Sequence, residues 1–368
     1  MDAFNPLIRE GKCLSLTILI PIAGNRDIHD TIQSIIAQNY PGCEILILHN
    51  GIQDLPEGTE VTEKDEYHED LLIRELFIRK LGKGNALNEG ICHTESDLVC
   101  VLDADCILHK DALVNAVRHF SNADVAAVGG RLLVRTDDSS MLETIQFCEY
   151  TKTFHLNRRV FAWLNAQCLI SGAFGIFRRS ALLEINGYDT DTVGEDMELV
   201  LRLQEEAYRQ SKRVIVYEPA AICHTAVPHS LRRLMRQRDR WQRGLMDCLI
   251  KHHHMILNPH YGLLGTVTLF YQLLIELLGP VFWILYMVIS VLVNFDPLAY
   301  LISAGYALTQ IGMTLFAVSL DHRHKAGEFL KLIPGLVLTS MEGIILHIAI
   351  MGARLYGMIT FHWRRMVW

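Results

Sequence analysis

The sequence predicts an α/β fold, an open and mainly parallel sheet covered by helices, followed by an apolar helical region. The run LSLTILIPI at Leu14–Ile22 predicts the sheet, because its continuous β-branched and leucine content is typical of a strand buried on both faces. Strand-like and helix-like patterns then alternate, as in βαβ units. The scarcity of charged residues after about Tyr261 predicts the helical region. We expect one domain over residues 1–255 and interfacial and transmembrane helices over residues 256–368.

The expected elements of the first domain follow one another closely. Asp30 is expected to cap a helix after the first strand. The other expected strands are Glu44–Leu48, Leu71–Ile78, Leu98–Leu102 and Val125–Val134, and the other expected helices are Gly84–His93, Asp111–Phe120, Ser180–Ile185, Asp196–Gln210 and Ser230–Lys251. From Val134 to Arg179 the pattern is longer and less regular. This rhythm indicates an open sheet of the nucleotide-binding kind.

Composition argues against several classes of protein. The net charge of −7 is opposite to what neutralising nucleic-acid phosphates requires, and we expect no nucleic-acid partner. The nine cysteines form no CxxC pair, so we expect no zinc site and interpret them as reduced thiols of a cytoplasmic domain. The first residues, MDAFNPLIREGK, lack the apolar core of a signal peptide.

Three apolar segments make up the C-terminal region: Tyr261–Phe295, Leu298–Leu320 and Leu332–Thr360. A spanning helix needs about 20 apolar residues, so the second and third segments are each long enough. Gly279-Pro280 interrupts the first segment. We therefore expect Gly262–Leu278 to lie in the interface or against the first domain, and Val281–Phe295 to cross the bilayer.

Basic residues near these segments predict orientation. The linker Asp321–Lys331 carries Arg323, Lys325 and Lys331, which favours a cytoplasmic loop. Arg354, Arg364 and Arg365 would then lie on the opposite side if the last segment crosses, so its lying in the interface is the alternative. We expect an integral protein of the cytoplasmic membrane whose first domain faces the cytoplasm.

Asp103-Ala104-Asp105 directly follows the expected strand Leu98–Leu102. Ligands of open α/β sheets bind at the carboxyl ends of strands, which is where these carboxylates would lie. Mg²⁺ and Mn²⁺ prefer carboxylates and keep positions open for phosphate oxygens. The alternative is a pair of loop carboxylates that cap the next helix. The position after a buried strand favours the metal site.

Gly194-Glu195-Asp196 opens the expected helix MELVLRLQEEAY. Acidic residues at a helix start are favoured by the helix dipole, so a capped N-terminus is one interpretation. The functional interpretation is a general base, a carboxylate within hydrogen-bond reach of the proton that it removes.

Arg236–Gly244 reads RQRDRWQRG, within an arginine-rich expected helix. One interpretation is a basic amphipathic helix on anionic lipid headgroups. Gln237, Arg240 and Trp241 better suit a site that clamps a diphosphate through guanidinium groups and stacks a sugar ring on an indole. The cluster His252-His253-His254 is interpreted as imidazoles at a headgroup boundary, with a metal site as the alternative.

Six motifs occur in order: LTILIPIAGN, GKGNALNEG, VLDADC, SGAFGIFRRSAL, NGYDTDTVGED and QRDRW. Together they resemble family 2 glycosyltransferases, and within that family the membrane-embedded branch that includes cellulose, hyaluronan, chitin and poly-N-acetylglucosamine synthases. The resemblance covers about Leu14 to Tyr261, and the following YGLLGTVTLFYQLLIELLGP is similar too. It implies a GT-A-type nucleotide-diphospho-sugar transferase domain followed by a C-terminal α-helical membrane region.

The resemblance also implies roles for residues that match the family's motifs. Asp103 would contact the nucleotide ribose or diphosphate, with Lys83 near the nucleotide. Asp105 would hold the Mg²⁺ or Mn²⁺ that offsets charge on the leaving diphosphate. Asp196 would be the catalytic base. The acceptor and diphosphate side would comprise Gln237, Arg240 and Trp241 of QxxRW, together with Gly172, Phe174 and Glu195.

Two departures from the family pattern concern the nucleotide base. His49-Asn50-Gly51-Ile52 stands where the family usually has Asp-Asp-Gly-Ser, so a carboxylate that contacts uracil is missing. Asn50 can accept from the uracil N3 proton and donate to a carbonyl, which keeps a UDP-sugar the expected donor without excluding another base. Ile22-Ala23-Gly24-Asn25-Arg26 likewise replaces Ala-Tyr-Asn-Glu in the first motif.

The expected reaction is an inverting, metal-dependent transfer of a sugar from a nucleotide diphosphate to a growing polysaccharide at the cytoplasmic membrane face. Alternatives are a single addition to a lipid-linked acceptor and a non-catalytic membrane protein that binds nucleotide sugars. Membrane lipid and a second copy or partner membrane subunit are further expected partners. The enzyme reading depends on Asp105, Asp196 and Trp241 converging on one cleft at the edge of the sheet.

Overall fold

The computed structural model describes residues 14–24, 26–38, 40–53, 61–68, 71–135, 140–210, 215–292, 297–320 and 348–364. The chain forms two compact units, each made of two stretches. The first unit comprises Met1–Leu132 and Gln167–Ala226, and the second comprises Leu133–Ala166 and Val227–Trp368. The domain boundary expected near residue 255 stays a prediction, because compactness does not test where a catalytic domain ends.

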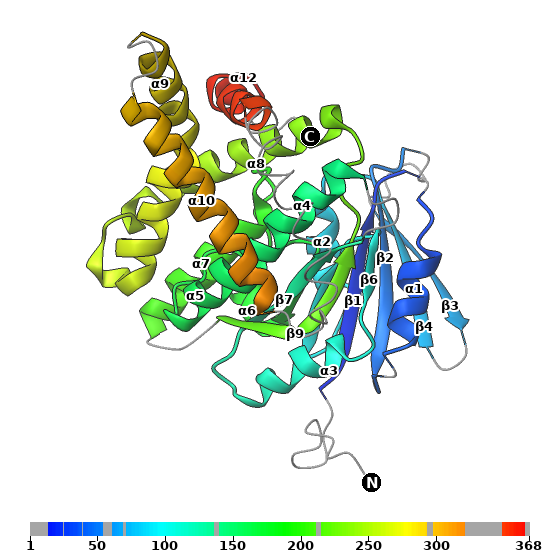
Figure 1. The fold of residues 1–368 in the computed structure, drawn as a ribbon. Coiled ribbons are helices and arrows are strands. Elements are labelled where there is room, and N and C mark those ends of the chain that lie inside the picture. Colours follow the sequence, from blue (N-terminus) through cyan, green and yellow to red (C-terminus); the bar gives the residue numbers. More distant parts are fainter. Residues whose placement is uncertain are drawn as a thin grey trace. The chain divides into compact units, whose positions relative to one another are not determined.

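The first unit contains a nine-stranded sheet in the order β3-β4-β2-β1-β5-β8-β7-β9-β6 (Figure 1). The strands are β1 (Leu16–Ile22), β2 (Cys43–Asn50), β3 (Val61–His68), β4 (Leu71–Ile78), β5 (Leu98–Leu102), β6 (Cys106–Leu108), β7 (Ala127–Val134), β8 (Phe174–Arg178) and β9 (Ile215–Thr225). The strands expected from the sequence are all present. β3, β6, β8 and β9 were not expected.

The four strands β4, β2, β1 and β5 are parallel, as the sequence predicts. β1 pairs with β2 on one side and with β5 on the other, so the chain reverses its direction of progress across the sheet at the β1–β5 junction. Ligands of open α/β sheets bind in the crevice outside the carboxyl ends of strands at such a junction. Asp103, the residue after β5, is therefore at the expected position.

The other half of the sheet is antiparallel. β8 pairs antiparallel with β5, Leu102 lying opposite Phe174, and β7 pairs antiparallel with β8. The carboxyl end of β5 consequently meets the amino end of β8. This pairing brings the residues just before Phe174 beside those just after Leu102, although they are about 70 positions apart in the sequence.

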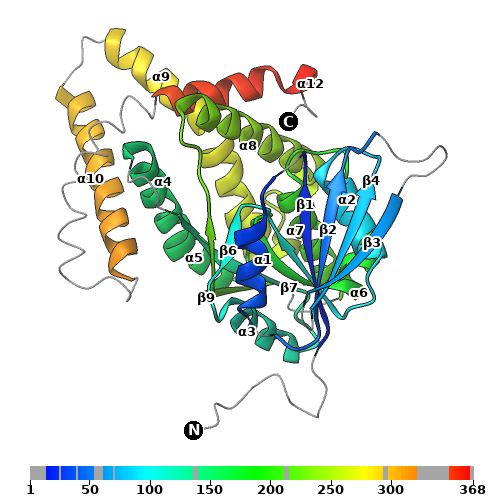
Figure 2. The same cartoon turned by 90° about the vertical axis from the view of Figure 1, so that its right-hand side faces the viewer.

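Helices cover both faces of the sheet. In the first unit they are α1 (His29–Ile36), α2 (Lys83–Cys92), α3 (Ala112–Val117) with η1 (Arg118–Ser121), α6 (Arg179–Glu184) and α7 (Glu195–Gln210). One cluster packs α2, α6 and α7 against Leu19, Leu46 and Val99 of the sheet. The alternate residues Ile18 and Ile20 are also fully buried, and Figure 2 shows α1 in front of the sheet.

The expected cap of the first helix is not made by Asp30. Helix α1 begins at His29 after Ile28, which places Asp30 inside the first turn. The carboxylate of Asp27 accepts a hydrogen bond from the His29 backbone N–H at 2.9 Å instead. The acid at position 30 still favours the helix start through the dipole.

The second unit is helical in its described part. Its elements are α4 (Met141–Lys152), η2 (Thr153–Asn157), α5 (Arg158–Trp163), α8 (Leu231–Lys251), η3 (His253–Met255), η4 (Pro259–Tyr261), η5 (Leu264–Leu269), η6 (Gln272–Leu277), α9 (Gly279–Leu292), α10 (Pro297–Ser319), the helix Ile348–Ile359 and α12 (Phe361–Arg364). Wide π-helical turns form η5 and η6 within the segment expected as one helix. The expected linker Asp321–Lys331 lies outside the described residues.

The expected break at Gly279-Pro280 is confirmed as a bend of 44° between Leu264–Leu277 and Gly279–Leu292. Proline removes a backbone donor, which explains the bend at that point. Within the described residues, only this bent pair taken as one unit has the length and apolarity to cross a bilayer, and no single helix has both.

Buried polar contacts hold α8 in the second unit. Arg243 is 1 % exposed and pairs with Asp239 at 3.2 Å along the same helix. Gln242 donates to the Leu277 carbonyl at 3.0 Å and accepts from Arg354 Nε at 2.7 Å. Arg354 also pairs with Glu276 at 3.2 Å. These contacts join α8, η6 and the helix Ile348–Ile359.

Candidate active site

Asp103 and Asp105 lie in a tight turn at the carboxyl end of β5. The Asp103 backbone N–H donates to the Ala173 carbonyl at 3.1 Å, and the Cys106 N–H donates back to the Asp103 carbonyl at 3.0 Å. The Asp103 side chain is 35 % exposed, and Asp105 is exposed. The turn therefore presents both carboxylates from a backbone fixed on two sides.

Lys83 begins α2 and connects two of the motifs. Its Nζ donates to Asp103 Oδ1 at 2.5 Å and to the Gly172 carbonyl at 2.9 Å. Burial by itself lowers the pKa of Lys83, but the negative charges of Asp103 and Glu195 outweigh it, and the pKa is raised. Lys83 therefore stays protonated. An ammonium group has three N–H donors, so one donor remains after these two bonds.

Asp196 lies in the first turn of α7, half-buried. Its Oδ1 accepts from the Met197 N–H at 2.9 Å, and its Oδ2 accepts from the Gly172 N–H at 3.2 Å. A Cβ atom built on Gly172 would lie 3.2 Å from Lys83 Nζ and 3.5 Å from Asp196 Cβ. Gly172 thus bridges the lysine and the aspartate with its backbone, and the absence of a side chain lets both approach.

The other residues predicted for the acceptor side of this unit are buried. Glu195 is 6 % exposed beside Asp196. Phe174 is 1 % exposed, and its ring lies so close to Gly130 that a Cβ built there would collide with it. The Phe174 side chain therefore packs inside the sheet, and of this motif it is Gly172 that touches the charged groups.

The surroundings of Asp105 raise its proton affinity. Burial first, and the charge of Asp103 second, raise the pKa of Asp105 above its ordinary value, with Arg26 and Lys83 acting in the opposite direction. Among the described residues, the Asp105 carboxylate has a weak contact with the Cys106 thiol at 3.8 Å. An exposed carboxylate with unused oxygens and a second carboxylate two residues away fit a hard divalent cation, which binds oxygen ligands and relieves their repulsion.

Two residues of this region were missed by sequence reasoning. Tyr188 is 5 % exposed, and burial together with Glu195, Asp196 and Asp103 raises its pKa well above the ordinary value. Asn88 of α2 holds the Tyr188 backbone with two hydrogen bonds, of 2.9 and 2.7 Å. The signal available in the sequence was an asparagine on the glycine-lined face of the GKGNALNEG helix.

Asn50 lies at the same edge of the sheet, and its side chain forms hydrogen bonds with two backbone groups. Its Nδ2 donates to the Ile22 carbonyl at 2.8 Å, and its Oδ1 accepts from the Gly82 N–H at 3.3 Å. These bonds tie the ends of β1 and β2 to the start of α2. His49 stacks on Phe77, with ring centroids 4.6 Å apart. Contact of Asn50 with a base stays a prediction.

The QxxRW residues lie on α8 in the second unit. Trp241 is 41 % exposed, and the Arg238 guanidinium lies 4.5 Å from its ring centroid while pairing with Glu149 at 2.5 Å. The buried Oε1 of Gln237 has no hydrogen-bond partner among the described residues, and Arg240 is half-buried. The convergence of Trp241 with Asp105 and Asp196 stays a prediction.

Comparison with known proteins decides the family. Residues 98–311 match the family described as Glycosyl transferase family group 2. Poly-beta-1,6-N-acetyl-D-glucosamine synthase of Staphylococcus epidermidis is 30% identical over 323 residues, which cover 83% of this chain and 74% of that protein. This chain belongs to the family 2 glycosyltransferases. The resemblance drawn from the six motifs is confirmed, and the protein is a glycosyltransferase.

Further relatives of this family 2 glycosyltransferase agree with that assignment. The synthase of the same name from Staphylococcus aureus (strain MSSA476) is 31% identical over 282 residues, 76% of this chain and 65% of that protein. A solved structure, the mannosyltransferase PcManGT from Pyrobaculum calidifontis in complex with GDP-Man and Mn²⁺, has a TM-score of 0.60 at 19% identity and covers 99% of this chain and 90% of its own. The predicted GT-A-like α/β fold is thereby confirmed.

Proposed function

We propose that this protein transfers an N-acetylhexosamine from a UDP-sugar to a growing polysaccharide, with inversion at the anomeric carbon. The name of the relatives, poly-beta-1,6-N-acetyl-D-glucosamine synthase, supports the sugar and the polymer. The observation that carries the proposal is the connected array Asp103–Lys83–Gly172–Asp196 at the β1–β5 junction. It combines a cation, two carboxylates and a backbone bridge where the fold binds ligands.

The chemistry follows from the roles of these side chains. Asp196 accepts the proton of the acceptor hydroxyl, and that oxygen then displaces the nucleotide diphosphate from the opposite face of the anomeric carbon. The hydrogen bonds from Met197 and Gly172 hold the Asp196 carboxylate in one orientation. Lys83 holds Asp103 and directs its remaining N–H toward the diphosphate. Positioning and charge stabilisation contribute most of the rate.

Asp105 and Asp103 would hold Mg²⁺ or Mn²⁺. The exposed Asp105 carboxylate and its repulsion from Asp103 support this assignment. When bound, the cation offsets the negative charge that develops on the departing diphosphate. Asp103, whose Oδ1 is held by Lys83, would accept a hydrogen bond from the ribose through its other oxygen, or meet the diphosphate through the cation.

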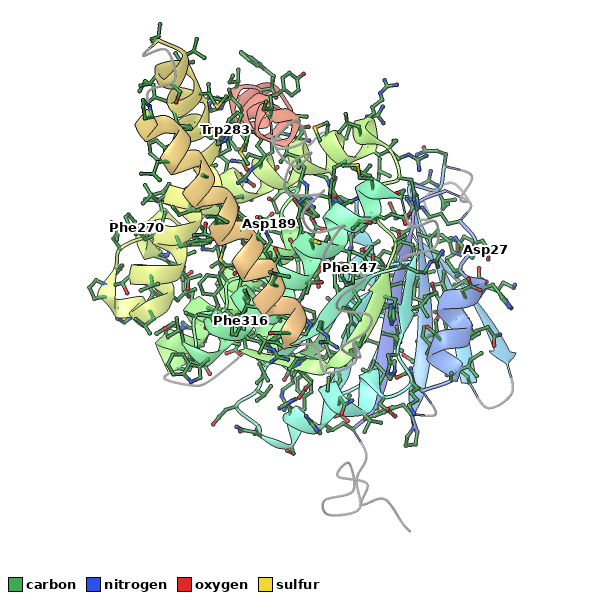
Figure 3. The ribbon with its side chains drawn as sticks, viewed as in Figure 1. Asp27, Phe147, Asp189, Phe270, Trp283 and Phe316 are labelled. Carbon is green, nitrogen blue, oxygen red and sulfur yellow. The ribbon has the colours of Figure 1, made fainter. Side chains whose placement is uncertain are left out.

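We further propose that the second unit attaches the protein to the cytoplasmic face of a membrane. Apolar side chains on its helices are exposed, among them Phe270 and four residues of α9: Phe282, Leu285, Val288 and Leu292 (Figure 3 labels Phe270). On α8 both acidic residues, Asp239 and Asp247, are buried and paired, whereas Arg232, Arg233 and Arg236 are exposed. An apolar surface with a purely cationic exposed stripe suits anionic headgroups.

Transfer by membranes that contain the protein tests the proposal. Membranes are incubated with UDP-N-acetylglucosamine, other UDP-sugars and GDP-mannose, with Mn²⁺ or Mg²⁺ and after chelation. Release of UDP and a ladder of oligomers are expected with UDP-N-acetylglucosamine. A single added sugar would instead identify a transferase acting once on a lipid-linked acceptor, and release of GDP alone would contradict the UDP donor.

A further inference from the structure

Asn88 is a polar residue of α2 that the proposed mechanism does not use. Its side chain lies between α2 and the loop that leads from α6 into α7. Nδ2 donates to the Tyr188 carbonyl at 2.9 Å, and Oδ1 accepts from the Tyr188 N–H at 2.7 Å. One side-chain amide thus satisfies both backbone polar groups of a buried loop residue, as a neighbouring strand would.

Two glycines allow this contact. Gly187 has a φ of +67°, and a Cβ built on it would collide with Asn88 Oδ1. Gly84 lies one turn before Asn88 on the same face of α2, where a Cβ would lie 3.2 Å from the Asp189 carbonyl and 3.7 Å from Tyr188 Cβ (Figure 3 labels Asp189). The loop therefore approaches α2 over a full helical turn, at a distance that only glycine permits on both sides.

The loop is short and closely held up to Asp196. It leaves α6 through a left-handed Asn186, with the Gly187 N–H bonded to the Leu182 carbonyl at 2.8 Å. Thr192 and Val193 are 2 % and 5 % exposed. Seven residues separate Tyr188 from Asp196. Thr190 and Asp191 between these buried positions are exposed, so a displacement at Tyr188 reaches the start of α7 through the short chain itself, which is buried again at Thr192 and Val193.

The helix that carries Asn88 also carries Lys83. Lys83 fixes Asp103 and the Gly172 carbonyl, and Gly172 in turn bonds Asp196. Helix α2 therefore reaches the base by two routes: through Lys83 and Gly172 from one side, and through Asn88 and the Tyr188 loop from the other. The first connection includes the charged groups of Lys83 and Asp103, and the second consists of hydrogen bonds that fix the position of the loop.

We infer that Asn88 is a positioning residue for the transfer reaction: through its two bonds to Tyr188 it sets the place of the Asp196 carboxylate relative to the acceptor hydroxyl. The inference rests on the proposed function, because it gives Asp196 the role of base. Asn88 touches neither substrate nor cation in this scheme. Its loss should therefore lower the rate of transfer while leaving the binding of the donor nucleotide intact.

The test compares Asn88→Ala with Asn115→Ala, whose amide also donates to a distant carbonyl, that of Ala220, at 3.3 Å. Asn88→Ala is expected to lower kcat about 100-fold, the effect of roughly a 1 Å misplacement of a reacting group. The affinity for UDP in the presence of Mn²⁺ should match that of Asn115→Ala, whereas the thermal midpoint should be lower, because the buried Tyr188 N–H and carbonyl lose their partner. Hydrogen exchange should increase in the peptide that spans Asn186–Gly194 and not in the peptide that spans β5.

A double-mutant cycle separates positioning from general damage. Gly187→Ala drives a methyl group into the Asn88 side chain, so it should produce the same fall in kcat with unchanged UDP affinity. Because removing the Asn88 side chain makes room for that methyl, the double variant should lose less than the product of the two single losses. Multiplicative losses, or equal falls in kcat and UDP affinity, overturn the inference. So does full activity of Asn88→Ala in a protein whose wild type transfers sugar, whereas a wild type without transfer contradicts the proposed function itself.

Discussion

Two groups of carboxylates in the first unit differ in how completely their oxygens are hydrogen-bonded. Glu218 of β9 is 7 % exposed and accepts from Arg118 at 2.6 Å, His119 at 2.7 Å and the Ala220 N–H at 2.8 Å. In the second cluster Lys83 bonds Asp103, two backbone N–H groups bond Asp196, and Asp105 is exposed. The first cluster is saturated and can do nothing except stabilise the fold. The second keeps oxygens available for a ligand, and this is what distinguishes a site from a buried ion pair.

The largest expected effect comes from the base. Asp196→Asn keeps the shape of the side chain but removes its ability to accept a proton, so kcat should fall about 1000-fold. Binding of UDP with Mn²⁺ should persist, as calorimetry would measure. Asp124→Asn, at an exposed aspartate, is the control and should transfer at the wild-type rate. A variant at position 196 that retains full transfer would falsify the assignment of the base.

The second effect concerns the cation. Asp105→Asn should weaken UDP binding in Mn²⁺ by about 100-fold, in the range seen when metal sites lose supporting groups. UDP binding without metal should change little, because Asp105 contributes through the cation. Asp111→Asn, at another exposed aspartate nearby in sequence, provides the comparison. Equal Mn²⁺ affinity in the Asp105 and Asp111 variants would contradict the metal role.

The third effect concerns the space at Gly172, between Lys83 and Asp196. Gly172→Ala places a methyl group 3.2 Å from Lys83 Nζ, so either the lysine or the start of α7 must shift by a few tenths of an ångström. We expect transfer to fall about 10-fold, with kcat affected more than the affinity for UDP. Gly352→Ala, where nothing lies within 4 Å of the new methyl, should be neutral in the same assay.

Substitution of Glu218 should have the smallest effect on activity and a clear effect on stability. Burial would raise its pKa, but the bonds from His119, the Ala220 N–H and Arg118 outweigh burial and lower the pKa to about 2, from an ordinary 4.5. A carboxylate with a depressed folded-state pKa contributes stability that is fully present above pH about 4.5 and is lost as pH falls toward about 2.

Glu218→Gln should therefore cost on the order of 3 kcal/mol at pH 7, and less as pH falls through that window, while transfer by the folded fraction stays unchanged. Denaturant unfolding at pH 7 and pH 3 measures the difference, with the exposed Glu95→Gln as control. A loss that does not diminish at low pH would show that the carboxylate charge is not its source.

The parallel strands could be predicted from the sequence, whereas four strands that form antiparallel pairs, β3, β6, β8 and β9, could not. β4 and β5 begin and end at the predicted residues: β5 is a continuous apolar run, and in β4 apolar residues stand on both sides of Arg74-Glu75. β3, with the sequence VTEKDEYH, is a charged outer strand paired on one side, and β9 contains Glu218-Pro219, which reads as a break. The five-residue β8 lies within the irregular stretch and becomes a strand by pairing with both β5 and β7.

Motifs with charged side chains were found from the sequence, but the groups that hold them were not. The family resemblance selected Lys83 and Asp103 separately, and the structure joins them by a hydrogen bond that the motifs did not predict. The sequence places Asn88 on the glycine-lined face of its helix, but a helical pattern does not tell which loop a side chain will reach. The role of Gly172 depends on a backbone N–H and a carbonyl, which every residue possesses.

The antiparallel pairing of β7 with β8 has a consequence for diversity among related enzymes. Gly129 and Gly175 are register partners, so the chain that leaves β7 and the chain that enters β8 are clamped side by side. The part of the second unit between them, residues 140–166, can change in length or sequence without moving the ends of the strands, whereas Gly172 and Ala173, next to β8, contact the catalytic turn and cannot. Related enzymes could therefore differ in this inserted segment while they keep the same residues around the sugar donor.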